Sequence, residues 1–319
     1  MSSTKRNYLY TYASHEDEES LCRLELTALL GVEPPTGLPI LRSPVLIDPS
    51  RSPFIRERIE PVCEGDTLEE LIAQASRISL GDGVTFKVLF VKKNDLAPGS
   101  KIEFEEQRRM ERAVGAVIRG RADVHRPDRV FGLVAYERRW YLGPYADNQA
   151  VWLKHAKKPR EYSIALPARV ARAVANIAVP NPDGIKAIDP CCGIGTVLVE
   201  ARSMGIDIVG RDINPLAAQG ARENLVHFGL SGEVSAGAIE DVRSTYDVAI
   251  VDLPYNHVTR ISEDVERAIL QETRRIARRA VIISHRKIEE ELAELGFAVE
   301  SRCESRKGAS FVRHIAVCR

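Results

Sequence analysis

The chain has 319 residues, and its 45 lysines and arginines balance its 45 aspartates and glutamates. A chain of this length predicts two domains, because single hydrophobic cores rarely grow beyond about 250 residues. The balanced charge predicts neither an overall polyanion binder nor an acidic tail, so any surface for nucleic acid must be a local patch.

Cysteine usage and the N-terminal stretch indicate an intracellular protein. The six cysteines form no C-x-x-C pair and no clustered Cys/His spacing, which argues against a zinc site and for reduced thiols. The polar, acidic start lacks the apolar region of a signal peptide, and no run approaches the roughly 18 apolar residues of a membrane span. We expect a soluble cytoplasmic protein with no metal and no membrane partner, and the sequence identifies no protein partner.

The first half predicts a mixed α+β domain. Its apolar periodicity indicates strands at 7–13 and 85–93, helices at 18–31, 67–78 and 104–120, and two strands within 128–145 that join near Glu137 and Arg138. The prolines between 33 and 53 forbid a long helix and indicate an irregular or edge-strand segment. A polar, basic stretch at 154–162 marks a boundary, so we expect one domain with its linker at 1–155 and a second at 156–319.

The second half alternates strands and helices. We expect strands at 185–189, 207–212, 233–238, 247–252 and 280–285, helices at 195–205, 214–229, 262–279 and 287–296, and a final pair of strands at 297–304 and 310–319. Such alternation predicts a mostly parallel sheet with helices on both faces and ligands beyond the carboxyl ends of the strands. The final pair predicts a hairpin that makes one strand antiparallel.

The first candidate site is the turn in "AIDPCCGIGT", which joins an expected strand to an expected helix. Gly193 and Gly195 let the backbone turn tightly and approach a ligand just before the free N–H groups of the helix. The turn lacks the G-K-[ST] of a phosphate loop and the third glycine of a dinucleotide fingerprint. Asp189 before the turn and Asp212 after the next strand remain distinctive, and Asp212 is placed to accept both hydroxyls of a ribose. The alternatives are a structural turn at Asp189 and an N-cap at Asp212.

The second candidate site is "YDVAIVDLPYN", in which an apolar strand ends at Asp252 and turns at Pro254. Taken alone, this pattern favours an ordinary turn with Asp252 as a cap. Its position after the glycine turn and the second acidic strand end favours a functional role instead.

Together, "DPCCGIGTVLVEA", "GRDINPLAAQGARENL" and "DLPYN" resemble the successive motifs of class I S-adenosylmethionine-dependent methyltransferases that carry an [N/D]-P-P-Y tetrapeptide. "REYSIALPARVARAVANIA" resembles the helix before the first strand in tRNA guanosine-N2 methyltransferases, and "VGAVIRGRADVHRPDRVFGLVAYERRWYLG" is similar to a THUMP RNA-binding domain. The chain therefore resembles the THUMP-containing tRNA guanosine-N2 methyltransferases, whose archaeal and eukaryotic members modify guanosine 10. The resemblance implies a Rossmann-like class I methyltransferase sheet preceded by an α+β THUMP-like domain, S-adenosyl-L-methionine as cofactor, and RNA, above all tRNA, as partner.

The resemblance also implies roles for individual residues. Cofactor contacts are expected from Asp189, Pro190, Cys191, Gly193, Gly195, Thr196, Asp212, Ile213, Gly237, Ala238, Ile239 and Asp252. Catalytic roles are expected for Asp252, Leu253, Pro254 and Tyr255. Separately from the resemblance, the basic runs of the sequence predict contacts with RNA phosphates from Arg119, Arg121, Lys154, Lys157 and Lys158, for which the alternative is a solvated surface.

The chemistry explains why a strand should end in an acid, a proline and an aromatic. An exocyclic purine amine is a poor nucleophile, because its lone pair is delocalised into the ring. The Asp252 carboxylate and the Leu253 carbonyl can each accept one N–H of the amine, which aims the lone pair and stabilises the developing positive charge. Pro254 fixes the carbonyl, and Tyr255 offers a face on which the extruded base can stack.

Two positions depart from the family pattern. Leu253 replaces a proline, which is a mild change because this residue contributes its backbone carbonyl. Ala238 replaces an aspartate that commonly holds the adenine amino group, so this contact shifts to backbone groups or to Glu240 or Asp241.

Three functions stay open. The leading one is methylation of the N2 amine of a guanosine in tRNA. The others are N6-adenine or N2-guanine methylation of rRNA or DNA, and RNA binding by a relative whose methyltransferase half is inactive. Asp252 and a backbone carbonyl would serve both amines, so these residues do not choose between guanine and adenine.

Overall fold

The computed structural model describes residues 7–93, 102–162, 165–254, 262–308 and 311–319. The chain divides into two compact units. Unit 1 comprises the chain up to Ala13 together with Leu30–Ser50 and Phe54–Gln149, and unit 2 comprises Ser14–Leu29, Arg51–Pro53 and Ala150–Arg319. The main boundary between the units, at Gln149 and Ala150, falls close to the expected boundary at 155. Two segments of the first half, however, belong to unit 2.

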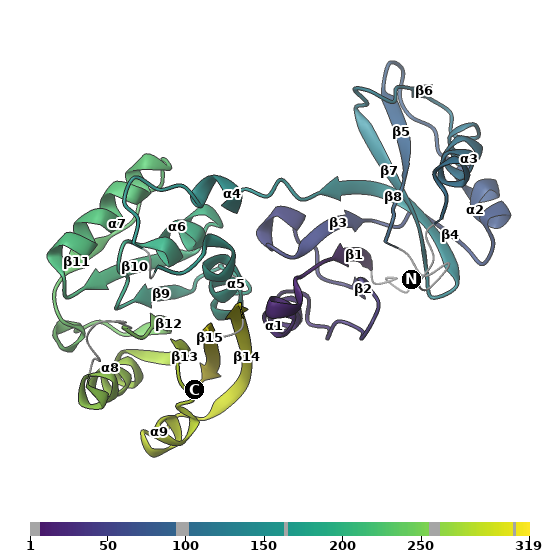
Figure 1. Cartoon of the computed structure of the whole chain (residues 1–319). Helices are drawn as coiled ribbons and strands as arrows, with labels where there is room; N and C mark the ends of the chain where they lie inside the picture. Colours follow the sequence, from purple (N-terminus) through teal and green to yellow (C-terminus); the bar gives the residue numbers. More distant parts are fainter. Residues whose placement is uncertain (1–6, 94–101, 163–164, 255–261, 309–310) are drawn as a thin grey trace. The chain divides into compact units, whose positions relative to one another are not determined.

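Unit 1 is an α+β unit with an eight-stranded sheet ordered β2-β1-β3-β8-β7-β5-β6, in which β4 also pairs with β8 (Figure 1). Its strands are β1 (Tyr8–Tyr12), β2 (Ile40–Ser43), β3 (Ile55–Ile59), β4 (Cys63–Gly65), β5 (Thr85–Phe90), β6 (Arg121–Ala122), β7 (Arg129–Tyr136) and β8 (Arg139–Asp147). Helices α2 (Leu68–Ala75) and α3 (Phe104–Gly115) contribute Leu71 and Val114 to its core. Strands β2, β4 and β6 are too short for a periodic pattern to reveal.

Unit 2 contains a seven-stranded sheet ordered β11-β10-β9-β12-β13-β15-β14. Its strands are β9 (Lys186–Asp189), β10 (Asp207–Asp212), β11 (Val234–Ala236), β12 (Tyr246–Asp252), β13 (Ala277–Ser284), β14 (Val299–Lys307) and β15 (Phe311–Cys318). The pairs from β11 to β13 are parallel, and β15 runs antiparallel between β13 and β14. The predicted Rossmann-like sheet with an antiparallel last strand is confirmed.

Helices cover both faces of this second sheet (Figure 1). On one face lie α5 (Ala168–Ala178), α6 (Thr196–Ser203) and α7 (Pro215–His227), each in contact with the next. On the other face α8 (Glu263–Ile276) and α9 (Glu289–Glu294) join the core with the 3-10 helix η3 (Ile239–Asp241). Three further short elements are η1 (Glu16–Glu18), η2 (Pro49–Arg51) and α4 (Trp152–His155). In the part of the chain that the structure describes, no helix combines the length and the apolar character needed to cross a membrane.

The junction between α8 and β13 differs from the prediction, which extended the helix to 279. The strand begins directly after the helix because Ala277 pairs with Tyr246 in the parallel ladder. Arg279, predicted as helical, lies in the strand and donates to the carbonyl of Ala178 (2.8 Å) at the end of α5. Sheet pairing therefore overrides the helix propensity of this arginine-rich stretch.

A buried polar network holds the first-half segments in unit 2. Glu25, on α1 (Glu19–Leu30), is fully buried and accepts hydrogen bonds from Ser52 and from the side-chain amide of Asn176 on α5, both at 2.7 Å. Asn176 accepts in turn from the guanidinium of Arg51 at 2.9 Å. Both segments therefore depend on the same side chain of α5.

Burial raises the pKa of Glu25 from its ordinary value of 4.5 to about 7. Hydrogen bonds from Ser52 and Asn176 and the charges of Arg172 and Arg51 oppose this rise only in part. The native carboxyl therefore keeps a proton that the unfolded chain releases.

We expect Glu25→Gln to flatten the dependence of stability on pH. Because the folded pKa lies above the unfolded one, the wild-type protein loses stability as pH rises from about 4.5 through about 7, and a neutral amide has no such loss. Relative to wild type, the variant should gain about 3 kcal/mol between pH 5 and pH 8. Urea unfolding of the full chain at both pH values measures this, with exposed Glu19→Gln on the same helix as the control. An equal stability difference at the two pH values would contradict the assignment.

Candidate active site

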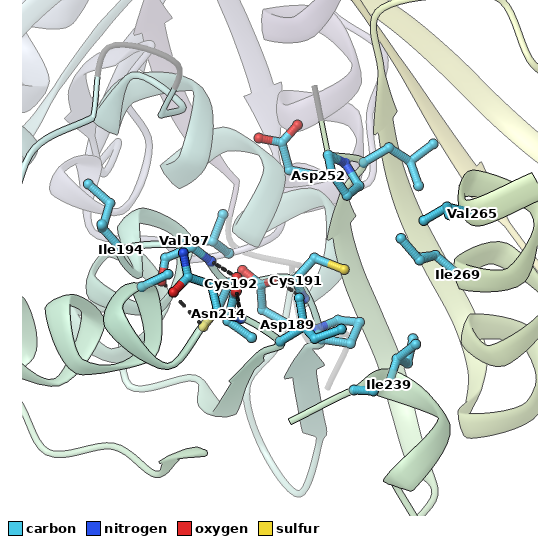
Figure 2. A pocket seen from close by; sticks show the side chains of 18 of the residues that line it. Asp189, Cys191, Cys192, Ile194, Val197, Asn214, Ile239, Asp252, Val265 and Ile269 are labelled. Carbon is cyan, nitrogen blue, oxygen red and sulfur yellow. Dashed lines mark hydrogen bonds between the residues drawn. The ribbon is translucent and has the colours of Figure 1, made fainter. Parts of the chain in front are cut away.

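A cavity of about 890 Å³ opens in unit 2 at the carboxyl ends of its central strands. The adjacent strands β10, β9 and β12 end in Asp212, Asp189 and Asp252, and all three aspartates line the cavity. Figure 2 shows Val265 and Ile269, from α8, on the wall opposite the loop that follows β9. The parallel sheet thus brings to one place the acids that the sequence separates.

The lining of this cavity is acidic. Its carboxyl side chains are those of Asp189, Asp212, Glu240, Asp252 and Asp264. Among the described residues that line it, none is a lysine or an arginine. Burial raises the pKa of Asp189 well above its ordinary value, and the charges of Asp252 and Asp212 raise it further. Such a cavity disfavours phosphate and favours a ligand that carries positive charge.

The loop between β9 and α6 needs glycine at two positions. Gly193 and Gly195 have φ angles of 52° and 78°, in the left-handed region that residues with a Cβ rarely adopt. At Gly195 an added Cβ would also lie 2.9 Å from the Cβ of Ala221 on α7. The loop therefore packs closely on α7 and delivers Thr196, the first residue of α6, to the cavity wall.

Asp212 connects the glycine loop to β10. One carboxylate oxygen accepts the N–H of Gly193 and the other accepts that of Asn214, both at 2.8 Å. Each oxygen keeps further lone pairs, and the half-exposed side chain can still accept hydroxyl donors from a ligand. The N-cap of α7 is Asn214, whose side chain accepts from the N–H of Leu216, so the alternative role of Asp212 as this N-cap is wrong.

The turn after β11 is built around Arg211. The guanidinium donates to the carbonyl of Ala238 (2.7 Å) and lies 3.4 Å from the carboxylate of Asp241. Gly237 has a φ of 146° and lies against this guanidinium, so a side chain there would collide with it. With Asp241 directed to Arg211, Glu240 is the carboxylate of this turn that lines the cavity.

Asp252 carries a buried oxygen that lacks a hydrogen-bond partner in the part of the chain that the structure describes. Its Oδ1 makes no hydrogen bond with any described residue. Burial raises the pKa of Asp252 to about 7, and the charge of Arg313 opposes this rise. Because a buried acceptor without a donor is destabilising, its presence indicates a position where a ligand supplies the donor.

The residues after Asp252 adapt the end of the strand to the core. The N–H of Leu253 donates to the carbonyl of Ile283 (2.9 Å), and its side chain, 3% exposed, packs in the core beside α8. Leucine in place of the family's proline therefore gains packing. Pro254 lines the cavity, and Tyr255 lies outside the described residues.

Arg313 was not predicted as part of the site. It lies on β15, is 5% exposed, and places its guanidinium 4.6 Å from the centre of the Phe311 ring. That ring packs 4.8 Å from the ring of His285, which lines the cavity after β13. The local signal was an arginine in a mostly apolar strand. Its relation to Asp252 depends on the order of β12, β13 and β15.

The predicted cofactor and catalytic residues differ in how they reach the cavity. Those that line it are Asp189, Pro190, Cys191, Gly193, Thr196, Asp212, Ile213, Ala238, Ile239, Asp252, Leu253 and Pro254. Gly195 and Gly237 shape the backbone behind the wall. Lining residues that were not predicted include Tyr162, Leu166, Ile194, Val197 and Asn214. Tyr162 and Leu166 lie in the stretch that resembles the family's helix before the first strand, but no motif within that stretch marked them individually.

The predicted RNA contacts are divided between the units. Arg119 and Arg121 are exposed in unit 1, and Lys154 and Lys157 are exposed in unit 2. Lys158 is only half-exposed, its ammonium lies 3.4 Å from the carbonyl of His155, and burial lowers its pKa. Lys158 is therefore less available to a phosphate than the sequence suggested.

Comparison with known proteins finds relatives of the sequence that forms unit 2. Residues 156–312 match the family described as RMKL-like, methyltransferase domain (UPF0020). A tRNA (guanine(10)-N2)-dimethyltransferase of Methanothermobacter thermautotrophicus is 31% identical over 47% of this chain and 48% of its own length. The U6 snRNA (guanine-N(2))-methyltransferase THUMPD2 of Mus musculus is 33% identical over 35% of this chain and 22% of its own. The chain thus spans about half the length of the archaeal relative, or less for the mouse protein.

A solved structure resembles the whole chain more distantly. The crystal structure of TrmN from Thermus thermophilus is 17% identical, with a TM-score of 0.47 over 98% of this chain and 99% of that one. No group of three or more His, Cys, Asp or Glu side chains in the described ranges could hold a metal ion. Over residues 156–312, the second half of this chain is therefore similar to the RMKL-like methyltransferase domains (UPF0020), and its mostly parallel sheet agrees with that similarity.

Proposed function

We propose that this protein transfers a methyl group from S-adenosyl-L-methionine to the exocyclic N2 amine of a guanosine in RNA, with tRNA as the substrate. The observation that carries this proposal is the acidic cavity, in which Asp252 holds a buried oxygen without a partner among the described residues. The archaeal and mouse relatives are both named as guanine-N2 methyltransferases, which supports guanine over adenine. The name of the mouse relative keeps snRNA as an alternative substrate.

The residues of the cavity fit the methyl donor. S-adenosylmethionine supplies an electrophilic methyl group on a positively charged sulfonium, and it also carries an ammonium group. Asp189 and the other carboxylates suit these charges, and the buried Thr196 hydroxyl, with no partner in the described chain, can bond a polar group of the ligand. Asp212 would accept hydrogen bonds from the ribose hydroxyls, and Glu240 would accept from the adenine amino group in place of the missing aspartate at 238.

Asp252 acts on the amine. Its carboxylate and the carbonyl of Leu253 accept the two N–H bonds, which orients the nitrogen lone pair and stabilises the charge that develops on nitrogen. Only the ionised carboxylate can do this well. The charge of Arg313 favours that form against the cost of burial.

Unit 1 is proposed as the RNA-binding, THUMP-like part of a cytoplasmic enzyme. Two of its exposed arginines, Arg119 and Arg121, lie beside and on the edge strand β6. A cut near residue 150 cannot test this role, because it would remove Glu25 and Arg51 from the buried network of unit 2. Point variants of the full chain test it instead.

Asp212→Ala should weaken binding of S-adenosylhomocysteine by about 1 to 3 kcal/mol, because charge-assisted hydrogen bonds to the ribose are lost. The bond that holds Gly193 is lost as well. Calorimetric titration measures the change, and Asp207→Ala, at the exposed start of the same strand, is the control. Unchanged affinity in the Asp212 variant would remove this residue from the cofactor site.

Asp252→Asn should reduce methyl transfer by about a hundredfold or more while leaving cofactor affinity within about twofold, because the carboxylate acts mainly in the transition state. In the wild type, kcat/KM should rise with pH through about 7, since burial raises the pKa of the acid whose ionised form is required. Asp247→Asn, at the start of β12, is the control. Nucleoside mass spectrometry of the methylated RNA identifies the product. An active Asp252 variant would show that the reaction does not pass through this residue.

Replacing Arg119 and Arg121 together by alanine should weaken RNA binding and reduce the slope of log K against log salt by about 0.7 to 0.9 for each phosphate that the variant no longer binds. Cofactor affinity should not change. Arg109→Ala, an exposed arginine on α3 paired with Glu106, is the matched control. An unchanged salt slope would place the RNA-binding surface elsewhere.

A further inference from the structure

A short segment of unit 2 reaches the cavity at its last residue, before the first strand of the sheet begins. We call residues 158–162 the strap. Its last residue, Tyr162, lines the cavity. Ile194, in the glycine loop, lines the same cavity. Tyr162 and Ile194 therefore belong to two irregular segments, about thirty residues apart in sequence. Because such segments lack the hydrogen bonds of a helix or strand, contacts with another element must hold them in place.

Asn224, on α7, joins these two segments. Its side chain is fully buried, and its Oδ1 accepts the N–H of Arg160 in the strap at 3.0 Å. Its Nδ2 donates to the carbonyl of Arg160 at 3.0 Å and to the carbonyl of Ile194 at 2.8 Å. One amide thus satisfies both backbone groups of a strap residue and one carbonyl of the glycine loop.

Neighbouring residues of α7 also contact both the strap and the glycine loop. One turn earlier on α7, a Cβ added at Gly220 would lie 3.4 Å from the side chain of Ile194 and 3.5 Å from the Cβ of Arg160. Glu223 forms an ion pair with the guanidinium of Arg160 at the surface. The strap and the loop therefore meet along one face of α7, and Asn224 is the buried polar contact at this seam.

We propose that Asn224 is a positioning residue for cofactor binding: it fixes the strap and the glycine loop to each other, so that both walls of the cavity are formed before the ligand arrives. The inference rests on the proposed function in that the ligand is S-adenosylmethionine. A ligand that had to order a loose strap would bind more weakly, because the ordering entropy would be subtracted from its binding free energy. Alanine removes all three hydrogen bonds, whereas aspartate keeps the acceptor for the N–H of Arg160 and loses both donated bonds.

The test combines binding, kinetics and hydrogen exchange on the full chain. In Asn224→Ala and Asn224→Asp, affinity for S-adenosylhomocysteine should fall about tenfold or more, while kcat at saturating cofactor stays within about twofold of wild type. Amide exchange in the unliganded protein should accelerate in the strap and leave α5 protected. Val226→Ala, an exposed residue of α7 without a bond to the strap among the described contacts, is the control and should change none of these values. The near-isosteric aspartate serves if alanine impairs folding.

The outcomes separate this inference from the proposed function. Wild-type affinity and wild-type strap exchange in both Asn224 variants would overturn the positioning role. So would a loss of kcat with unchanged cofactor affinity, or a uniform rise in exchange that includes α5, which would indicate a general structural role. If the wild type itself failed to bind S-adenosylhomocysteine, the proposed function would be wrong, and the exchange measurement would still decide whether Asn224 holds the strap.

Discussion

Three aspartates stand side by side at one edge of a parallel sheet, and the rest of the site depends on how their like charges are stabilised. Asp212 accepts hydrogen bonds from two backbone N–H groups, and Asp189 accepts one. Burial raises the pKa of Asp189. Asp252 has the buried charge of Arg313 in its surroundings. Like charges repel strongly where water is excluded, so the free cavity is poised to gain from a cation.

The sequence predicted the parts of this site that are local in the chain. Glycine turns and acids at strand ends follow from a few consecutive residues, and the alternation of elements indicated the sheet with its antiparallel strand. The roles of Arg313 and Asn224 could not be predicted from the sequence. Their partners lie on other strands and loops, and only the strand order and the packing of α7 bring them together.

The boundary between domains shows the same limit. A polar, basic linker suggested a division near residue 155, but a division along the sequence cannot assign α1 to the second unit. That assignment rests on buried bonds among Glu25, Asn176 and Arg51, which are ordinary polar residues in their local contexts. Helix α1 alone would be placed by its apolar face, and that face does not specify which sheet it covers.

The acidic cavity also constrains how an RNA could be bound. Phosphates would be repelled by carboxylates that line a cavity without lysine or arginine among its described residues, whereas a neutral base would not. The favourable contacts of an RNA backbone would therefore come from basic residues away from the cavity, since a chain of zero net charge can bind a polyanion only through a local basic patch. Recognition and chemistry then act on different parts of the substrate. In the proposed reaction, the base would reach the carboxylate of Asp252 as a neutral, planar group and would acquire positive charge only as its amine reacts, at the position where Asp252 can stabilise that charge.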